Sequence, residues 1–456
     1  MTFSSAAFLF VFLPLVFLLY HASPSLRVKN FLLSVASVFF YAFGEPLYVL
    51  LLLLSVGVNY FLALAIDARR SRVTLTIAVL FNLSLLGVYK YAGFAAQLLN
   101  GIPGVALPVP QILLPIGISF YTFQILSYVV DVYRGDAKVQ KSYGDLLLYI
   151  SFFPQLIAGP IVKYHDIDEQ IRNRKSTPEM CAEGIRRFLV GLSKKLLLAN
   201  TCGWIADTAF GADAPGTALA WLGAFAYCLQ IYHDFSGYSD MAIGLGGMFG
   251  FRIPENFRYP YASGSIKEFW RRWHISLSTW FKEYLYIPLG GNRHGRVRTY
   301  RNKLIVFFTT GLWHGASLNF IVWGLWHGAF SIVEDFLRPH TKKWLSALWR
   351  PVTLLAVLVG FVFFRADTLA AGVSYLGSMF TAAPSASVLA ECLSGYNMTV
   401  LGAATLLSFP VIPALKRAVG EKISSAAGYA VSVLLFAGCV MSLASSTFNP
   451  FIYFRF

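Results

Sequence analysis

The uncharged stretch that decides the fold is LIVFFTTGLWHGASLNFIVWGLWHGAFSIV, residues 304–333. It spells the hexapeptide GLWHGA twice, at 311–316 and again at 324–329. One continuous helix of this length would measure ~45 Å, whereas the hydrocarbon core of a bilayer is only ~30 Å thick. We therefore predict a broken or re-entrant pair of helices, with the glycine-rich repeats as the breaks.

Apolar runs recur along the whole chain of 456 residues. The sequence is 57% hydrophobic and only 13% charged, with a mean hydropathy of +0.60, whereas a soluble domain is usually ~25% charged. The composition predicts an all-α polytopic membrane protein with about 11 to 13 membrane-embedded helices, some of them re-entrant or broken. We interpret the apolar run at 6–20 as the first helix rather than a signal peptide, and 1–456 as a single membrane domain.

The positive charge is concentrated in one region. The net charge is +15, and 252–303 holds eleven Lys and Arg against three Asp and Glu, a net of +8. In a membrane protein such an excess first indicates cytoplasmic loops. The basic loop at 338–350 would lie outside if 304–333 crossed once, and a broken pair removes that conflict. Nucleic acid is not expected, because the basic residues alternate with membrane-seeking aromatics.

The basic region contains a candidate amphipathic helix at about 265–287. Apolar residues recur there at helical spacing, and basic residues occupy the other face, which is typical of a helix at the cytoplasmic interface. His274 lies at the boundary of the two faces. The weak candidates for contacts with a phosphate-bearing donor are Arg271, Arg272 and Lys282. Five cysteines without CxxC spacing indicate neither a disulfide framework nor a zinc site, so no metal is expected.

Histidines inside an apolar run are functional candidates by default. A neutral imidazole costs less to bury than a permanent charge, and it can exchange a proton with a hydroxyl. His314 lies eleven residues past Lys303, ~16 Å along a helix, whereas His327 lies closer to the charged end at Glu334. Depth therefore favours His314 as a general base. For His327 the more ordinary interpretation is a histidine bonded to a backbone carbonyl.

Other polar residues in apolar surroundings have weaker functional signals. His233, Asp234 and Asp240 lie in YHDFSGYSDMAIGLGGMFGF, whose small residues favour close helix packing. Arg365, Arg455 and Lys90 are expected to pair or to extend toward the interface.

Longer motifs give the chain a resemblance. It is similar to the membrane-bound O-acyltransferase (MBOAT) family, and within it to the alginate O-acetyltransferase membrane subunits. The similarity rests on FFPQLIAGPIVKY, IYHDFSGYSDMAIGLGGMFGF, IKEFWRRWHISLSTWFKEYLYIPLGGNRHG, TGLWHGASLNF and FFRAD, in this order. Departures occur at His233, at Leu318 and in 258–264.

The resemblance implies a fold, two site residues and an activity. The family fold is a bundle around a central funnel or tunnel, in which His314 is the essential residue and His274 the second polar residue of the site. The implied activity moves an acetyl group from a cytoplasmic thioester, acetyl-CoA or another acyl thioester such as an acyl carrier, to an exopolysaccharide, with alginate the expected polymer. Periplasmic SGNH-type acetyltransferases are the implied partners, and the bacterial inner membrane is the implied location.

Two other functions stay open at this point. The same chemistry serves D-alanylation of teichoic acid and acetylation of cellulose or peptidoglycan. A transporter without covalent chemistry would use buried histidines as proton relays and would show an inverted repeat, which this sequence lacks.

Overall fold

The computed structural model describes residues 1–341, 347–382, 386–445 and 451, and this part of the chain contains helices and no strand. It forms two compact units, Met1–Phe188 with Ser239–Pro254 and Leu189–Tyr238 with Glu255–Phe456. The predicted all-α architecture is confirmed. The organisation as a single domain stays a prediction.

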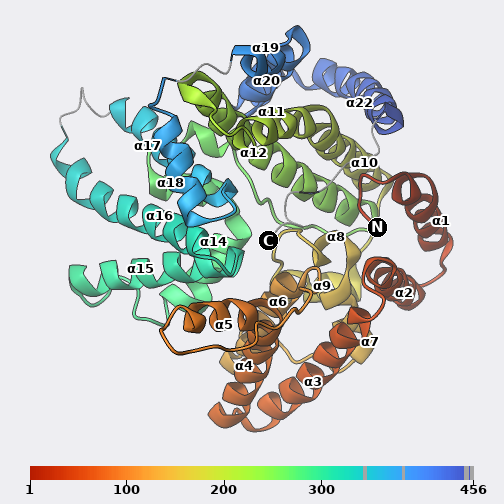
Figure 1. The fold of residues 1–456 in the computed structure, drawn as a ribbon. Coiled ribbons are helices and arrows are strands. Elements are labelled where there is room, and N and C mark those ends of the chain that lie inside the picture. The colour runs from red at the N-terminus through yellow and green to blue at the C-terminus, as the bar shows by residue number, and fades with distance from the viewer. Residues whose placement is uncertain (342–346, 383–385, 446–450, 452–456) are drawn as a thin grey trace. The chain divides into compact units, whose positions relative to one another are not determined.

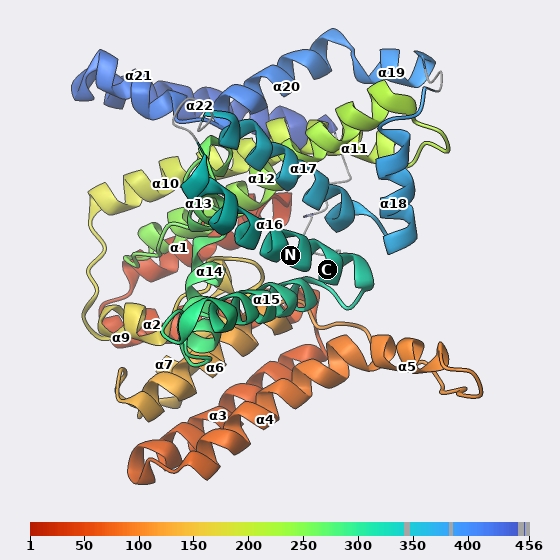
Figure 2. The ribbon, with the colours of Figure 1, turned by 90° about the vertical axis from the view of Figure 1, so that its left-hand side faces the viewer.

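The first unit begins with a π-helical turn that runs into the first α-helix, and its long helices α3 and α4 lie side by side in both views (Figures 1 and 2). Its elements are η1 (Phe8–Phe12), α1 (Leu13–Ala22), α2 (Leu26–Gly44), α3 (Tyr48–Arg69), α4 (Arg72–Leu86), η2 (Gly87–Tyr91), α5 (Ala92–Asn100), α6 (Ile118–Arg134), α7 (Tyr143–Ser151), α8 (Phe153–Leu156) and α9 (Tyr164–Asn173). Helix α10 (Pro178–Ser193) continues from this unit into the second.

The second unit holds every histidine singled out by the sequence. It contains most of the long α12 (Gly216–Met248), whose last turns belong to the first unit. Its other elements are η3 (Lys194–Ala199), α11 (Asn200–Phe210), η4 (Pro260–Ala262), α13 (Ile266–Arg272), α14 (Ile275–Phe281), η5 (Lys282–Tyr286), α15 (Gly295–His314), α16 (Leu318–Leu337), η6 (Arg338–His340), α17 (Trp349–Arg365), α18 (Leu369–Ser378), α19 (Ala386–Cys392), α20 (Gly395–Leu407), α21 (Val411–Val419) and α22 (Glu421–Ser445).

Several helices are suited to cross a bilayer, so the multi-pass membrane assignment holds. Five stretches of the described chain are long and apolar enough: Leu26–Gly44, Tyr48–Arg69, Arg72–Asn100, Leu318–His340 and Ala427–Ser445. The pair α20 and α21 is a sixth candidate, bent by 72° at a short break. The figure of about 11 to 13 embedded helices also counts shorter and more polar helices, and it stays a prediction.

The run at 304–333 is a helical hairpin, as predicted, and its break falls at the first GLWHGA copy only. Helix α15 ends at His314, and α16 begins after an extended Gly315 and Ser317. The two arms lie side by side in both views (Figures 1 and 2). Because the chain turns back, both basic ends of the hairpin lie on one side, which removes the conflict over the loop at 338–350.

Glycines allow the close contact between the two arms. A Cβ atom at Gly324 would lie 2.2 Å from the Phe307 carbonyl oxygen, and one at Gly311 would lie 2.3 Å from the Phe320 carbonyl oxygen. Real Cβ atoms do not approach backbone this closely. The hexapeptide therefore recurs because each copy supplies a glycine to the same helix–helix contact.

The segment 265–287 is not one interfacial helix, and this part of the prediction is wrong. It is divided into α13, α14 and η5, with a break at His274, which has a left-handed conformation (φ 43°). The predicted apolar stripe is buried inside the second unit rather than facing a membrane surface, with Phe269, Trp273 and Leu277 at most 3% exposed. The left-handed backbone of His274 is what breaks the segment, because a residue in that conformation cannot continue a right-handed helix.

Substitution of Gly324 by alanine should force the two arms of the hairpin apart, since the clash is with backbone rather than with a flexible side chain. We expect a loss of ~1–3 kcal/mol or more in stability, seen as a lower midpoint of thermal unfolding in detergent. The matched control is Gly402→Ala in α20, where a Cβ meets nothing within 4 Å. Equal midpoints for the two variants would contradict the packing role.

Candidate active site

Two histidines that are far apart in the sequence meet in the second unit. The ring centroids of His274 and His314 lie 6.5 Å apart. Both side chains are buried, with 0% and 3% of their surface exposed. His314 is the last residue of α15, and His274 occupies the break between α13 and α14. The fold therefore places both predicted site residues in one small region.

A buried asparagine holds His274 in its unusual backbone conformation. Asn256 Oδ1 accepts hydrogen bonds from the Ser276 backbone N–H at 3.1 Å and from the Ser276 hydroxyl at 2.9 Å. The Ile275 N–H donates to the Asn256 carbonyl at 3.0 Å. A left-handed residue other than glycine costs ~1–3 kcal/mol, so it persists only where its surroundings fix it, often at a functional site. Asn256 supplies that fixation.

The same asparagine sets the tautomer of His274. Its Oδ1 lies 3.3 Å from His274 Nδ1, and because this oxygen can only accept, Nδ1 carries the proton. His274 Nε2 then offers a lone pair, and within the described chain this buried atom has no hydrogen-bond partner. His274 lies outside the helices suited to span a membrane, and burial lowers its pKa to about 3. The imidazole is therefore neutral near pH 7.

Aromatic rings surround His314. The rings of Trp313, Trp323 and Phe364 lie 4.9, 4.9 and 5.3 Å from it, and Phe235 packs edge-on against His274 at 4.7 Å. Such an apolar shell excludes water and strengthens any electrostatic interaction inside it. An imidazole in such surroundings suits proton exchange with a hydroxyl or thiol.

His327 belongs to the other arm of the hairpin and faces different neighbours. Its ring stacks on Phe269 at 6.1 Å, and Trp323 lies between it and His314, 5.4 Å from the His327 ring. The predicted bond to a backbone carbonyl is not found, since neither ring nitrogen has a hydrogen-bond partner in the residues described. His327 is thus separated from the pair of histidines by one indole ring.

The remaining polar candidates are engaged in structural contacts. His233 Nε2 contacts the Ala404 carbonyl at 2.8 Å, which ties α12 to α20. Asp234 pairs with Lys195 at 2.6 Å, and in the first unit Asp240 pairs with Arg187 at the same distance. In that unit Gly184 and Gly244 also bring α10 and α12 into backbone contact, as the small residues predicted.

The arginine and lysine candidates from the sequence differ in how they are held in the structure. Arg365 pairs with Asp207 at 2.5 Å, and Lys90 contacts the Ser119 hydroxyl at 3.2 Å. Arg455 lies outside the described residues. Of the proposed donor contacts, Arg272 is held by Glu268 at 2.7 Å, whereas Arg271 and Lys282 are exposed.

Sequence reasoning missed Asn256. It lies 18 residues before His274, in a loop between Glu255 and Phe257, where an asparagine is unremarkable. The available signal was Pro254 before it and an aromatic residue after it, which indicate a fixed rather than a mobile loop. Its role depends on a turn that the sequence does not reveal.

Comparisons with known proteins identify the family of the chain. The family model described as membrane-bound O-acyltransferase matches residues 71–365, which contain His274, His314 and His327. The probable alginate O-acetylase AlgI of Azotobacter vinelandii is 41% identical over 500 residues, covering 100% of both chains. The peptidoglycan O-acetyltransferase of Helicobacter pylori is 37% identical over 83% of this chain and 79% of its own. The teichoic acid D-alanyltransferase of Bacillus subtilis is 30% identical over 54% and 66% respectively.

Substitution of Asn256 by alanine removes the acceptor of several buried hydrogen bonds. We expect a loss of ~2–3 kcal/mol in unfolding free energy, since each bond contributes ~0.5–1.5 kcal/mol and the donors become unsatisfied. Chemical denaturation in detergent measures this loss. Asn397→Ala is the matched control, because that buried amide makes one long bond, of 3.4 Å, to the Glu391 carbonyl. A smaller effect at 256 than at 397 would contradict the role assigned to Asn256.

Burial of neutral His274 also predicts a pH dependence of stability. The unfolded chain binds a proton at this imidazole below pH ~6.5, whereas the folded chain does so only near the lowered pKa of about 3. Stability from this group is therefore complete above pH ~6.5 and is lost as the pH falls toward 3. Unfolding midpoints between pH 7.5 and 5 should fall less in His274→Gln than in the wild type. Parallel pH profiles would contradict a neutral buried His274.

Proposed function

The chain belongs to the membrane-bound O-acyltransferase family, and on that premise we propose that it moves an acetyl group from a cytoplasmic thioester across the membrane for O-acetylation of an exopolysaccharide, most simply alginate. The observation that carries the proposal is the contact of His274 and His314 in a dry aromatic shell. Full-length similarity to a probable alginate O-acetylase supports the choice of polymer.

The proposed reaction is acyl transfer with His314 as the general base. An acceptor hydroxyl attacks the thioester carbonyl of the donor, and His314 takes the hydroxyl proton. The carbon–sulfur bond breaks, and the imidazolium returns the proton to the leaving thiolate. The products are the new ester and the free thiol, and the proton taken from the hydroxyl ends on that thiol. The site is dry, so hydrolysis of the thioester is suppressed.

His274 has a different proposed role. It is neutral, its Nδ1 proton is committed to Asn256, and its Nε2 lone pair can accept a hydrogen bond from the donor or the acceptor. We assign it to orienting the reacting group beside His314. Acetyl-CoA or another acyl thioester is a substrate in this scheme, and the exposed Arg271 and Lys282 are the proposed contacts for its phosphates or for an acyl carrier.

The location and the partners derive from the same scheme. A multi-pass protein of the bacterial inner membrane would keep the thioester inside and pass only the acetyl group outward. The described chain is made of helices packed in two units, so a periplasmic SGNH-type acetyltransferase is the proposed partner for the final transfer to the polymer. The basic region 252–303 supports a cytoplasmic side for the donor.

Peptidoglycan acetylation and teichoic acid D-alanylation are the alternatives, each supported by a relative with that name. Both relatives align over less of this chain than the alginate O-acetylase of Azotobacter vinelandii does. Alginate acetylation is therefore the preferred function.

Substitution of His314 by alanine should abolish acetylation, because it removes the proposed general base, whereas His274 is assigned to orienting the reacting group. We expect the acetyl content of the polymer to fall by at least ~100-fold in a deletion strain complemented with the variant. His327→Ala, at an equal membrane level, is the control and should retain most of the activity. Full acetylation with His314→Ala would contradict the assignment, and absence of acetyl esters with the wild type would indicate a different cargo or polymer.

A further inference from the structure

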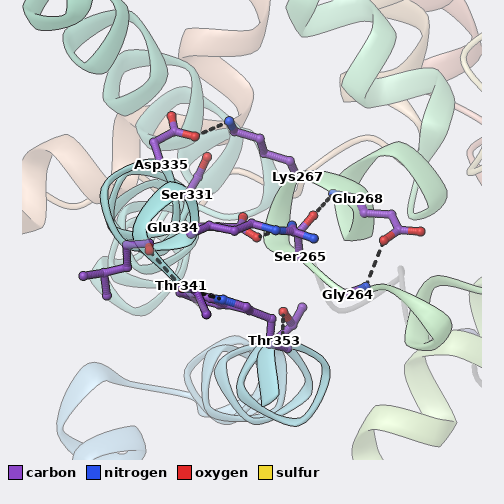
Figure 3. A network of polar contacts seen from close by, with 12 residues as sticks. Gly264, Ser265, Lys267, Glu268, Ser331, Glu334, Asp335, Thr341 and Thr353 are labelled. Atoms are coloured by element: carbon purple, nitrogen blue, oxygen red, sulfur yellow. Dashed lines mark hydrogen bonds and ion pairs between the residues drawn. The ribbon is translucent and has the colours of Figure 1, made fainter. Parts of the chain in front are cut away.

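One carboxylate of the hairpin contacts two lysines that belong to different segments. Asp335 lies near the end of α16, where Oδ1 contacts Lys267 of α13 and Oδ2 contacts Lys303 of α15. Figure 3 shows Asp335 joined to Lys267, with Ser331 one turn away on the same helix. The Lys303 ammonium also donates to the Ser331 hydroxyl at 3.3 Å. Asp335 is thus the meeting point of three helices.

The Asp335 carboxylate offsets the repulsion between the two lysines. Lys267 and Lys303 carry like charges and would repel each other without the carboxylate between them. The neighbouring Glu334 pairs with Arg338 at 3.1 Å and also attracts Lys303 through its charge. Lys303 and Asp335 have only 14% and 20% of their side-chain surface exposed, so solvent screens their interaction only partly. Lys267 is more exposed, at 45%, so its pair with Asp335 is screened more strongly. Loss of the Asp335 charge would leave the repulsion between the two lysines uncompensated.

Both clamped segments end at a histidine of the candidate site. His274 lies seven residues after Lys267, just beyond the end of α13. His314 lies eleven residues after Lys303 in α15, ~16 Å of helical rise. Helix α13 is fixed at its start, where Ser265 accepts the Glu268 N–H and Glu268 accepts the Gly264 N–H, each at 2.9 Å. A displacement at the lysine end can reach the histidine end through the hydrogen-bonded turns of each helix.

We propose that Asp335 is a positioning residue for acyl transfer, which sets the spacing between His274 and His314 by binding Lys267 and Lys303 at the same time. The role in acyl transfer rests on the proposed function, whereas the effect of Asp335 on the spacing of the two histidines does not. A misplacement of ~1 Å between reacting groups can cost up to ~100-fold in rate. The spacing of the two histidines, rather than binding of the donor, is the quantity that Asp335 controls.

The first experiment measures the kinetics of acetyl transfer in proteoliposomes. Acetyl-CoA is the donor, alginate oligosaccharides are the acceptor, and the periplasmic partner is added. The release of the free thiol of CoA is the measured signal. Asp335→Asn should lower kcat by roughly 10- to 100-fold and leave KM for acetyl-CoA within about twofold. Asp335→Glu should restore most of kcat, because it keeps the charge. The control is Glu391→Gln, an exposed carboxylate on α19 that should change neither constant. A raised KM with unchanged kcat, or the same raised KM in Lys267→Met, would overturn the proposal in favour of phosphate binding by the lysines.

A second experiment keeps the proposal testable if acetyl transfer cannot be reconstituted. Spin labels at Arg271→Cys and Arg301→Cys, exposed positions on α13 and α15, report the separation of the two helices by pulsed electron paramagnetic resonance. Cys181→Ser removes the one native cysteine that is not buried. Asp335→Asn should lengthen and broaden the distance distribution, and Asp335→Glu should not. An unchanged distribution would refute the clamp. A lengthened distribution, combined with wild-type protein that restores no acetyl esters in the deletion strain, would refute only the proposed function.

Discussion

The contact between α15 and α16 is the constraint on which the rest of the site depends. Two helix backbones touch there because Gly311 and Gly324 have no side chains, and a methyl group at either position would lie within 2.3 Å of a carbonyl oxygen. In lipid, helices gain little from apolar burial alone, so close van der Waals packing has to supply the attraction. The hairpin turns where it does because Gly315 and Ser317 are extended, and His314 is left at the end of a helix rather than inside one.

Because only the first copy ends a helix, the histidines of the two identical hexapeptides have different surroundings. In the first copy the helix stops at the histidine, and His274 from another segment approaches to 6.5 Å. In the second copy the helix continues, and His327 is enclosed by Phe269, Trp270 and Trp323. The local sequence is the same in both, so the difference comes from the residues after each copy. Ser317 separates the first copy from the next helix, whereas the second copy runs on into the rest of α16.

The sequence predicted the features that depend on periodicity and depth. The broken hairpin was indicated by the length of the uncharged run, and the preference for His314 by its distance from Lys303. The close helix crossings were indicated by clustered glycines. Features that depend on a turn or on a partner from elsewhere were not predictable. Asn256 is an ordinary loop asparagine until the left-handed His274 gives it something to hold, and the aromatic stripe of 265–287 looks interfacial until the protein core covers it.

Packing of aromatic rings therefore dominates near the two histidines, whereas ion pairs dominate at the lysine ends of α13 and α15. Near His274 and His314 the interior is aromatic, and the neutral imidazole of His274 avoids the cost of burying charge. At the other end of α13 and α15, charge is concentrated where water still reaches it, and Asp335 holds two lysines that would otherwise repel. A charged clamp beside the histidines would require costly desolvation, whereas at the far end of short helices it constrains the site without entering it. The separation of the charged anchor from the reacting groups explains how a site with few polar atoms can still be held in one geometry.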